Sequence, residues 1–125
     1  MGGGVKDHPG DPHGFDRTIQ GFFRGLEASI ETAAEPWTVA GIARACRVGG
    51  TYLTASCKEI FNTTPSDQLC RIRLAHAARL LQEKKDRTIT GIAFNTGFNS
   101  SQYFATRFRR QFGKSPQQYR AGPRP

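Results

Sequence analysis

The stretch that decides the fold is GFNSSQYFATRFRRQFGKSPQQYR, which spans residues 97–120. Phe104, Phe108 and Phe112 lie four residues apart in it, so a helix would carry all three on one face. Arginines fall between them and occupy other angles of the same helix. The stretch therefore predicts a helix whose apolar side packs against a core and whose opposite side is strongly cationic.

The positive charge of the chain is concentrated around this stretch. The 125 residues include 18 Lys and Arg against 10 Asp and Glu, which gives a net charge of +8 and a sequence pI near 10.0. Residues 71–120 hold a net charge of +9, whereas residues 1–70 hold −2. A local surplus of this size favours polyanions, with nucleic acid as the first candidate and an acidic membrane surface as the second.

The three cysteines predict buried thiols in a reducing compartment. Cys46, Cys57 and Cys70 are odd in number and form no C-x-x-C pair, which argues against a disulfide framework. Each lies at a position where helical spacing places the apolar, core-facing residues. No His and Cys spacing suits zinc, so we expect no metal site and no cofactor. The sequence has no apolar run of transmembrane length and no hydrophobic signal segment, so we expect a cytoplasmic protein without membrane contact.

Apolar residues recur at helical spacing along most of the chain, and no segment alternates with the period of a strand. We therefore expect an all-α fold. Residues 1–14 and 121–125 are expected to be disordered, because Gly, Pro and polar residues dominate them. A first helix is predicted to start at Phe15 and to end by Ala33. A long helix is predicted over about residues 65–83, with proline at its first position.

A helix-turn-helix pattern lies on each side of the long helix, at about residues 38–62 and 88–113. The second pattern is longer in its turn by one residue, which leaves both flanking helices in phase. The pairs are Thr38 and Thr88, Gly41 and Gly91, Ile42 and Ile92, Ala43 and Ala93 at an offset of 50, then Lys58 and Arg109, Phe61 and Phe112, Pro65 and Pro116 at an offset of 51.

Duplication of this motif has a consequence for DNA binding. The second helix of a helix-turn-helix enters the major groove, and adjacent sites on one DNA face lie about 34 Å apart. A long helix of about 18 residues spans roughly 27 Å, which suits a connector between two such reading helices. One chain can then make both readings, so we expect the domain to act as a monomer.

The second reading helix presents polar residues beside its core-facing phenylalanines. Two of them lie one turn apart on another face, and arginines flank that face. We expect the short polar residues to meet base edges and the arginines to hold phosphates, with Arg107 suited to either role. The candidates for base contact are Ser101, Gln102 and Thr106, and those for phosphate contact are Arg107, Arg109 and Arg110.

Residues 15–120 resemble the DNA-binding domain of the AraC/XylS family of bacterial transcription regulators. The piece IAFNTGFNSSQYFATRFRRQFGKSPQQYR, residues 92–120, is similar to the signature of that family, in which I-A, G-F, Y-F, F-(K/R)-(K/R), F-G, S-P and Y-R recur at this spacing. The resemblance implies about seven helices, two helix-turn-helix subdomains and a linking helix. It also implies asymmetric binding of double-stranded promoter DNA and recruitment of RNA polymerase.

The resemblance also assigns candidates to the first reading helix, where this chain departs from the family. The matching base-contact positions hold Thr51, Thr54 and Ala55, which are small and suit a thymine methyl better than a bidentate hydrogen bond. Lys58 matches a phosphate-contact position. Two departures concern the backbone: arginine stands at position 47, where the family usually has glycine, and glycine stands at position 49, where serine often caps the helix.

The sequence thus predicts a sequence-specific DNA-binding domain of a bacterial transcription regulator, not an enzyme, associated with the nucleoid. Whether it activates or represses is open, as is the presence of a separate sensor domain in the whole protein. One alternative is a basic module that binds DNA or protein without base readout. Another is a thiol-based alkyl acceptor, which the inward phase of the three cysteines disfavours.

Overall fold

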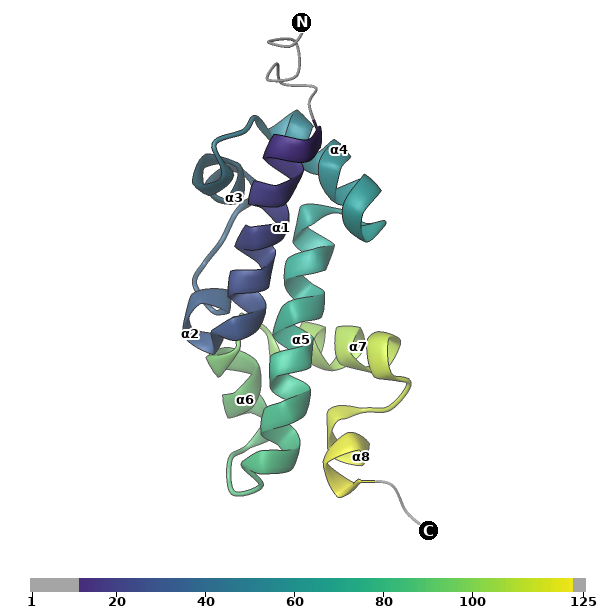
Figure 1. Cartoon of the computed structure of the whole chain (residues 1–125). Coiled ribbons are helices and arrows are strands. Elements are labelled where there is room, and N and C mark those ends of the chain that lie inside the picture. The colour runs from purple at the N-terminus through teal and green to yellow at the C-terminus, as the bar shows by residue number, and fades with distance from the viewer. Residues whose placement is uncertain (1–11, 123–125) are drawn as a thin grey trace, which may run out of the picture. The chain divides into compact units, whose positions relative to one another are not determined.

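The computed structural model describes residues 12–122, which form eight helices and no strand (Figure 1). The all-α expectation is therefore confirmed for the described residues. The helices are α1 (Pro12–Ala28), α2 (Ile30–Ala33), α3 (Val39–Cys46), α4 (Gly50–Phe61), α5 (Pro65–Glu83), α6 (Ile89–Asn95), α7 (Ser101–Phe112) and α8 (Pro116–Ala121).

The first helix differs from its prediction at both ends. It begins at Pro12, so three residues assigned to the tail are helical, and residues 1–11 lie outside the described part. It ends at Ala28 because Ser29 adopts an extended conformation, and the Ser29 side chain accepts a hydrogen bond from the Thr32 amide at 3.2 Å. A serine that caps a new helix in this way competes with continuation of the old one. The short α2 is the helix beyond the expected seven.

The other chain end also differs from expectation. Helix α8 extends to Ala121, one residue into the segment that was predicted to be disordered. Residues 123–125 lie outside the described residues. Helix α8 begins with a complete capping box, in which the Ser115 and Gln118 side chains each bond the other's backbone amide.

The chain divides into two compact units, and each contains one helix-turn-helix. The described part of the N-terminal unit consists of residues 12–28 and 37–69. The C-terminal unit consists of residues 29–36 and, among those described, 70–122. Helix α5 contributes its first turn to the N-terminal unit and the rest to the C-terminal unit.

In the N-terminal unit α1 packs against α3 and α4, and α3 packs against α4 (Figure 1). The ring of Phe23 is almost fully buried and meets Phe61 of α4 edge to face, with 5.2 Å between ring centroids. Trp37 packs edge to face on Phe22, with 5.0 Å between ring centroids. The buried apolar residues are Ile19, Phe23, Leu26, Ile42, Ala43, Cys46, Leu53, Cys57 and Leu69.

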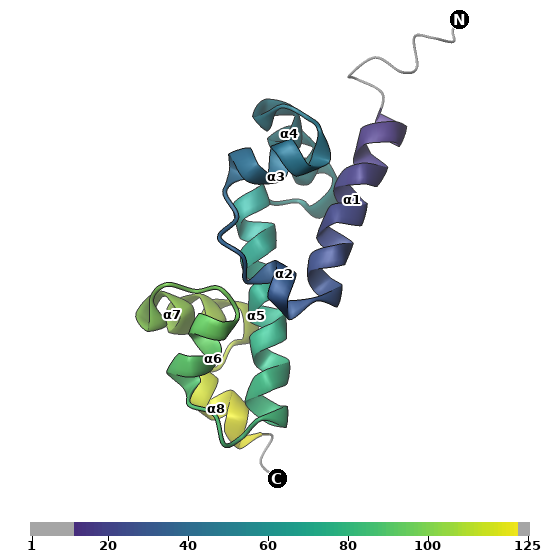
Figure 2. The same cartoon turned by 90° about the vertical axis from the view of Figure 1, so that its left-hand side faces the viewer.

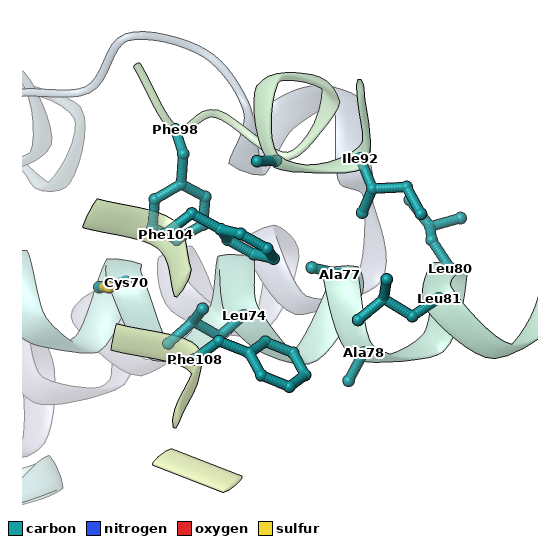
Figure 3. Close-up of a cluster of buried hydrophobic side chains, with 11 residues drawn as sticks. Cys70, Leu74, Ala77, Ala78, Leu80, Leu81, Ile92, Phe98, Phe104 and Phe108 are labelled. Atoms are coloured by element: carbon teal, nitrogen blue, oxygen red, sulfur yellow. The ribbon is translucent and has the colours of Figure 1, made fainter. Parts of the chain in front are cut away.

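The C-terminal unit is built on the apolar side of α5. Helices α6 and α8 both pack on α7 (Figure 2). Phe104 and Phe108 point from α7 towards Leu74 and Ala77 of α5 (Figure 3), and all four side chains are fully buried. Phe112 is only half-buried and stacks on Phe108, with 4.5 Å between ring centroids. The core-facing role predicted for these phenylalanines is confirmed, with Phe112 at its edge.

The segment 29–36 is held to α5 by one half-buried arginine. The Arg73 Nε donates to the Ala33 carbonyl at 2.7 Å, and its Nη2 donates to the Glu35 carbonyl at 2.6 Å. Burial lowers the pKa of Arg73, and a charge on Cys70 would act in the opposite direction. These two hydrogen bonds satisfy carbonyls that no helix could satisfy, so Arg73 fixes the path of the chain between α2 and α3.

Caps repeat between the two units as closely as the sequence does. Thr38 and Thr88 both cap a helix by accepting from a glycine amide three residues later, at 3.0 and 2.9 Å. At the other end of the motif Asn62 and Gly113 both end a reading helix in the left-handed conformation, with φ of 59° and 76°. The duplication therefore extends to the first and last helix ends of the motif, whereas Gly49 and Ser100, at the start of the two reading helices, differ in capping.

Candidate nucleic-acid interface

Helix α7 exposes the polar side that the sequence predicted. Ser100 caps the helix by accepting from the Tyr103 amide at 3.1 Å, so Ser101 is the first helical residue and is exposed. Gln102 and Thr106 are also exposed. All three candidate base-contact residues of α7 are thus exposed, and Gln102 and Thr106 lie opposite Phe104 and Phe108.

The arginines of α7 differ in their surroundings. Arg109 and Arg110 are exposed in the last turn of the helix. Arg107 is half-buried: its Nη1 donates to the Tyr103 hydroxyl at 2.8 Å, and its guanidinium carbon lies 5.8 Å from the centroid of the Tyr103 ring. Arg107 is therefore held by hydrogen bonding and by cation–π attraction, whereas its two neighbours extend into solvent.

Tyr103 is 51% exposed, and its contact with Arg107 was not predicted from the sequence. The spacing of four residues between Tyr103 and Arg107 was a usable signal, because side chains four apart on a helix are neighbours. The ring of Tyr103 also approaches Phe98, at 6.4 Å between centroids, so one edge is supported by the core while the hydroxyl faces the cationic surface.

Gln102 and Thr106 are linked through the helix backbone. The Thr106 hydroxyl donates to the backbone carbonyl of Gln102 at 3.1 Å. The side-chain amide of Gln102 takes no part in this hydrogen bond. A hydroxyl that bonds its own helix has less capacity to donate to a base. Of the two residues, Gln102 therefore carries the stronger potential for hydrogen bonding to a base edge.

Helix α4 presents a different surface at the equivalent positions. Thr51, Thr54, Ala55 and Lys58 are all exposed, as the resemblance implied. At offset 51 Thr51 corresponds to Gln102, and Ala55 corresponds to Thr106. Gly49 caps α4 with no side-chain hydrogen bond, which confirms the expected loss of a serine cap.

The outer side of α4 borders a hollow of about 730 Å³ in the N-terminal unit. The first residue of α3 and the turn after α4 contribute the rest of its wall. The sequence did not predict this hollow, because its residues come from three separate segments. The lining residues are Val39, Gly50, Thr51, Thr54, Ala55, Lys58, Thr63 and Thr64.

Two of the threonines that line this hollow form hydrogen bonds with Asp67. The Thr63 hydroxyl donates to the Asp67 Oδ2 at 3.4 Å, and the Thr64 hydroxyl accepts from the Asp67 amide at 3.1 Å. Val39 adds a half-buried aliphatic side chain. The surface of the hollow is mostly apolar, and Lys58 supplies its one cation.

The three thiols are buried, as predicted. Cys46 and Cys57 are 1% and 0% exposed, and Cys70 is 7% exposed. Burial raises the pKa of Cys57 to about 11, with a further rise from the nearby Cys46, whose own pKa burial also raises. A thiol that stays protonated at neutral pH is a poor nucleophile. These environments add physical grounds against the alkyl-acceptor alternative.

The sequence and the geometry together define the class of this protein. Residues 42–122 match the profile of the family described as "Helix-turn-helix domain". That match covers more than half of the chain and includes both reading helices. The protein is therefore a helix-turn-helix protein.

Similar proteins narrow the class further. A 65-residue segment is 45% identical to the HTH-type transcriptional activator RhaS of Escherichia fergusonii, over 52% of this chain and 23% of that protein. The crystal structure of an AraC-type transcriptional regulator from Chromobacterium violaceum matches with a TM-score of 0.74 at 29% identity, over 87% of this chain and 94% of that one. The chain belongs to the AraC/XylS family and represents its DNA-binding domain.

A third comparison bears on the fold alone. The DNA-binding domain of AdpA, a global transcriptional factor solved in complex with a target DNA, matches with a TM-score of 0.69 at 24% identity, over 86% of this chain and 89% of that one. The chain spans about a quarter of the length of the RhaS proteins it matches. Within residues 12–122, no helix is long and apolar enough to cross a membrane.

Proposed function

We propose that this domain reads promoter DNA with α4 and α7 placed in successive major grooves on one face of the duplex. The observation that carries the proposal is that both reading helices have a buried apolar side and an exposed polar side. In α7 the buried side holds Phe104 and Phe108, while Gln102 and the arginines are exposed. In α4 the buried side holds Leu53 and Cys57, and the candidate contact residues lie outside.

Base readout and phosphate contact fall to different residues. Ser101, Gln102 and Thr106 contact bases from α7, and Thr51, Thr54 and Ala55 do so from α4. Lys58, Arg109 and Arg110 bind phosphates, because they are exposed cations near the ends of the reading helices. Arg107 also binds phosphate, since its guanidinium is fixed beside Tyr103 and does not extend freely towards a base. Four such contacts predict that the logarithm of the affinity falls with the logarithm of salt with a slope of about −3 to −4.

Helix α5 follows the first motif in the chain and precedes the second, which supports reading by a single chain. A continuous helix of 19 residues spans roughly 28 Å at 1.5 Å per residue. Successive major grooves on one face lie about 34 Å apart. The domain therefore binds as a monomer, and its asymmetric site reflects the different side chains of α4 and α7.

The proposal extends to the role of the whole protein. Binding at a promoter places the domain on the nucleoid in the cytoplasm, where it recruits RNA polymerase, and the similarity to RhaS activators supports activation as the outcome. The alternative of a basic module without base readout remains the competing hypothesis. Its hallmark is equal affinity for all duplexes at a given salt concentration.

Selection of bound duplexes from a random library tests the proposal. We expect enrichment of one asymmetric site of two half-sites about one helical turn apart. The selected duplex should then bind at least about 1,000-fold more tightly than a scrambled one at physiological salt. Sedimentation of the complex should show one protein chain per duplex. Equal affinity for selected and scrambled duplexes at two salt concentrations would instead establish the non-specific module.

A further inference from the structure

We propose that the N-terminal unit reads its half-site through the 5-methyl groups of thymines, which enter the mostly apolar hollow beside α4. This inference rests on the proposed function, because it assumes that α4 occupies a major groove. It states which chemical feature of the DNA the first reading helix recognises. It also implies that the two units read their half-sites by different chemistries.

Helix α4 has no long hydrogen-bonding side chain at its reading positions. The exposed residues at its reading positions are Thr51, Thr54 and Ala55, and none has a side chain long enough for the bidentate contacts that Arg, Gln or Asn make to purines. Lys58 is the one long polar side chain in the wall of the hollow. It lies near the end of α4, where a phosphate contact is the simpler role.

The hollow beside α4 is lined mostly by small side chains from three segments of the N-terminal unit. Thr51, Thr54 and Ala55 meet Val39 there, together with Thr63 and Thr64 from the turn after α4. The Thr63 hydroxyl donates to the Asp67 Oδ2, the Thr64 hydroxyl accepts from the Asp67 amide, and the surface of the hollow is mostly apolar.

Thymine is the base that can place an apolar group against such a surface. In the major groove the edges of the four base pairs present hydrogen-bond donors and acceptors, and the 5-methyl of thymine is their one apolar group. Apolar surface is stabilised by leaving water, and burying polar base edges against methyl groups without partners is costly. A mostly apolar wall therefore favours thymine and disfavours bases whose hydrogen-bonding groups would stay unpaired.

The equivalent positions of α7 provide an internal contrast. There Gln102 replaces Thr51, and Thr106 with its backbone-bonded hydroxyl replaces Ala55. The amide of Gln102 suits the donor and acceptor pair of adenine. The C-terminal unit is thus equipped for hydrogen-bond readout, and the N-terminal unit for methyl readout.

Replacement of thymine by uracil tests the inference, because it deletes the methyl group and leaves every hydrogen-bonding group in place. The selected duplex is used, and its half-sites are assigned by Gln102→Ala, which relaxes only the half-site of the C-terminal unit. Each contacted thymine of the other half-site should then lose about fourfold in affinity on replacement, the value for burial of one methyl group. Thymines in the flanking sequence serve as the control and should be neutral.

A pair of protein variants tests the methyl group of Thr54, the proposed partner of the thymine methyl. Thr54→Val keeps the branched shape and removes the hydroxyl, whereas Thr54→Ser keeps the hydroxyl and removes the methyl. We expect Thr54→Val to retain the preference of thymine over uracil and Thr54→Ser to reduce it. Thermal unfolding of both variants checks that neither change acts through stability.

The possible outcomes separate this inference from the proposed function. If no site is enriched from the random library, the proposed function fails. If a site is enriched but its N-terminal half-site contains no thymine, or tolerates uracil at every position, the methyl readout is wrong while base-specific binding stands. Loss of the thymine preference in Thr54→Val but not in Thr54→Ser would also overturn it, since the hydroxyl would then be the recognising group.

Discussion

Arg47 and Gly97 occupy equivalent positions in the two helix-turn-helix turns, 50 residues apart, and both adopt a positive φ, of 62° and 106°. Arginine pays a steric cost for this conformation that glycine does not pay. The fold therefore imposes the same backbone geometry on both turns, although the sequence supplies the favourable residue in only one of them.

Replacement of Arg47 by glycine should stabilise the domain. Relief of the left-handed strain is offset in part by the greater freedom of glycine in the unfolded chain, so we expect a net gain of about 0.5–1 kcal/mol. Urea unfolding measures the change. Because Arg47 is exposed at the end of α3, DNA affinity should change by no more than the loss of one distant charge. A destabilised Arg47→Gly variant would contradict the strain argument.

Replacement of Gly97 by alanine should have the opposite effect. A Cβ atom there would lie 2.6 Å from the Arg73 Nε and 3.1 Å from the Ala34 Cα, so it would displace the arginine that holds segment 29–36. We expect a loss of about 2–4 kcal/mol, which combines backbone strain with broken charge-assisted hydrogen bonds. Gly113→Ala is the matched control, because Gly113 also has a positive φ but open space around it. Equal losses in the two variants would remove the role given to Arg73.

Gln102→Ala should relax specificity at one position of the selected site. The expected cost is about 1–3 kcal/mol with the cognate base pair and close to nothing with the other three. Binding to all four base pairs at each position measures it. Gln117→Ala in α8 removes the same amide group from an exposed position outside the reading helices and is expected to be neutral. If Gln102→Ala left every variant site unchanged, Gln102 would not read a base.

Arg110→Ala should weaken binding to all duplexes to a similar extent. Loss of one phosphate contact reduces the salt dependence of the logarithm of affinity by about one unit. Salt titration of cognate and scrambled duplexes measures both effects. Arg87→Ala removes the same charge from the exposed connector between α5 and α6, away from the reading helix, and should leave the slope nearly unchanged. A loss confined to the cognate duplex would assign Arg110 to base readout instead.

The raised pKa of Cys57 predicts that stability falls at alkaline pH. The folded thiol keeps its proton up to about pH 11, while the unfolded thiol releases it near pH 9.0. The stabilising contribution is thus complete below pH 9 and is lost as pH rises from about 9 to 11, by an amount on the order of 2 kcal/mol. Urea unfolding across this range, compared with Cys57→Ala, isolates the effect. Parallel pH profiles for the two proteins would disprove it.

The sequence predicted some helix ends and missed others. Pro65 begins α5, as predicted, because the first helical position needs no amide donor. Ser29 was missed as a cap, since the apolar spacing continues through it into α2. Local competition between a capping hydroxyl and a continuing helix is not visible in periodicity alone.

Gln102 and Thr106 were predicted to lie on an exposed face, and they do, because helical phase is set by the core. Once Phe104 and Phe108 are buried, the angle of Gln102 and Thr106 follows. The contact between Tyr103 and Arg107 was also predictable from helical spacing, because side chains four residues apart on a helix are neighbours. The hollow beside α4 was not, because Val39 and Thr63 come to Thr54 only after the three segments have packed.

By itself, the sequence determined the helical class, the duplicated motif and the inward side of each reading helix, because these depend on spacing within one helix or on matches between two. Tertiary structure decided the rest. It held segment 29–36 to α5 through Arg73 and assembled the mostly apolar hollow beside α4 from separate segments. Such features arise from contacts between residues far apart in the chain, and no local pattern encodes the distance between them.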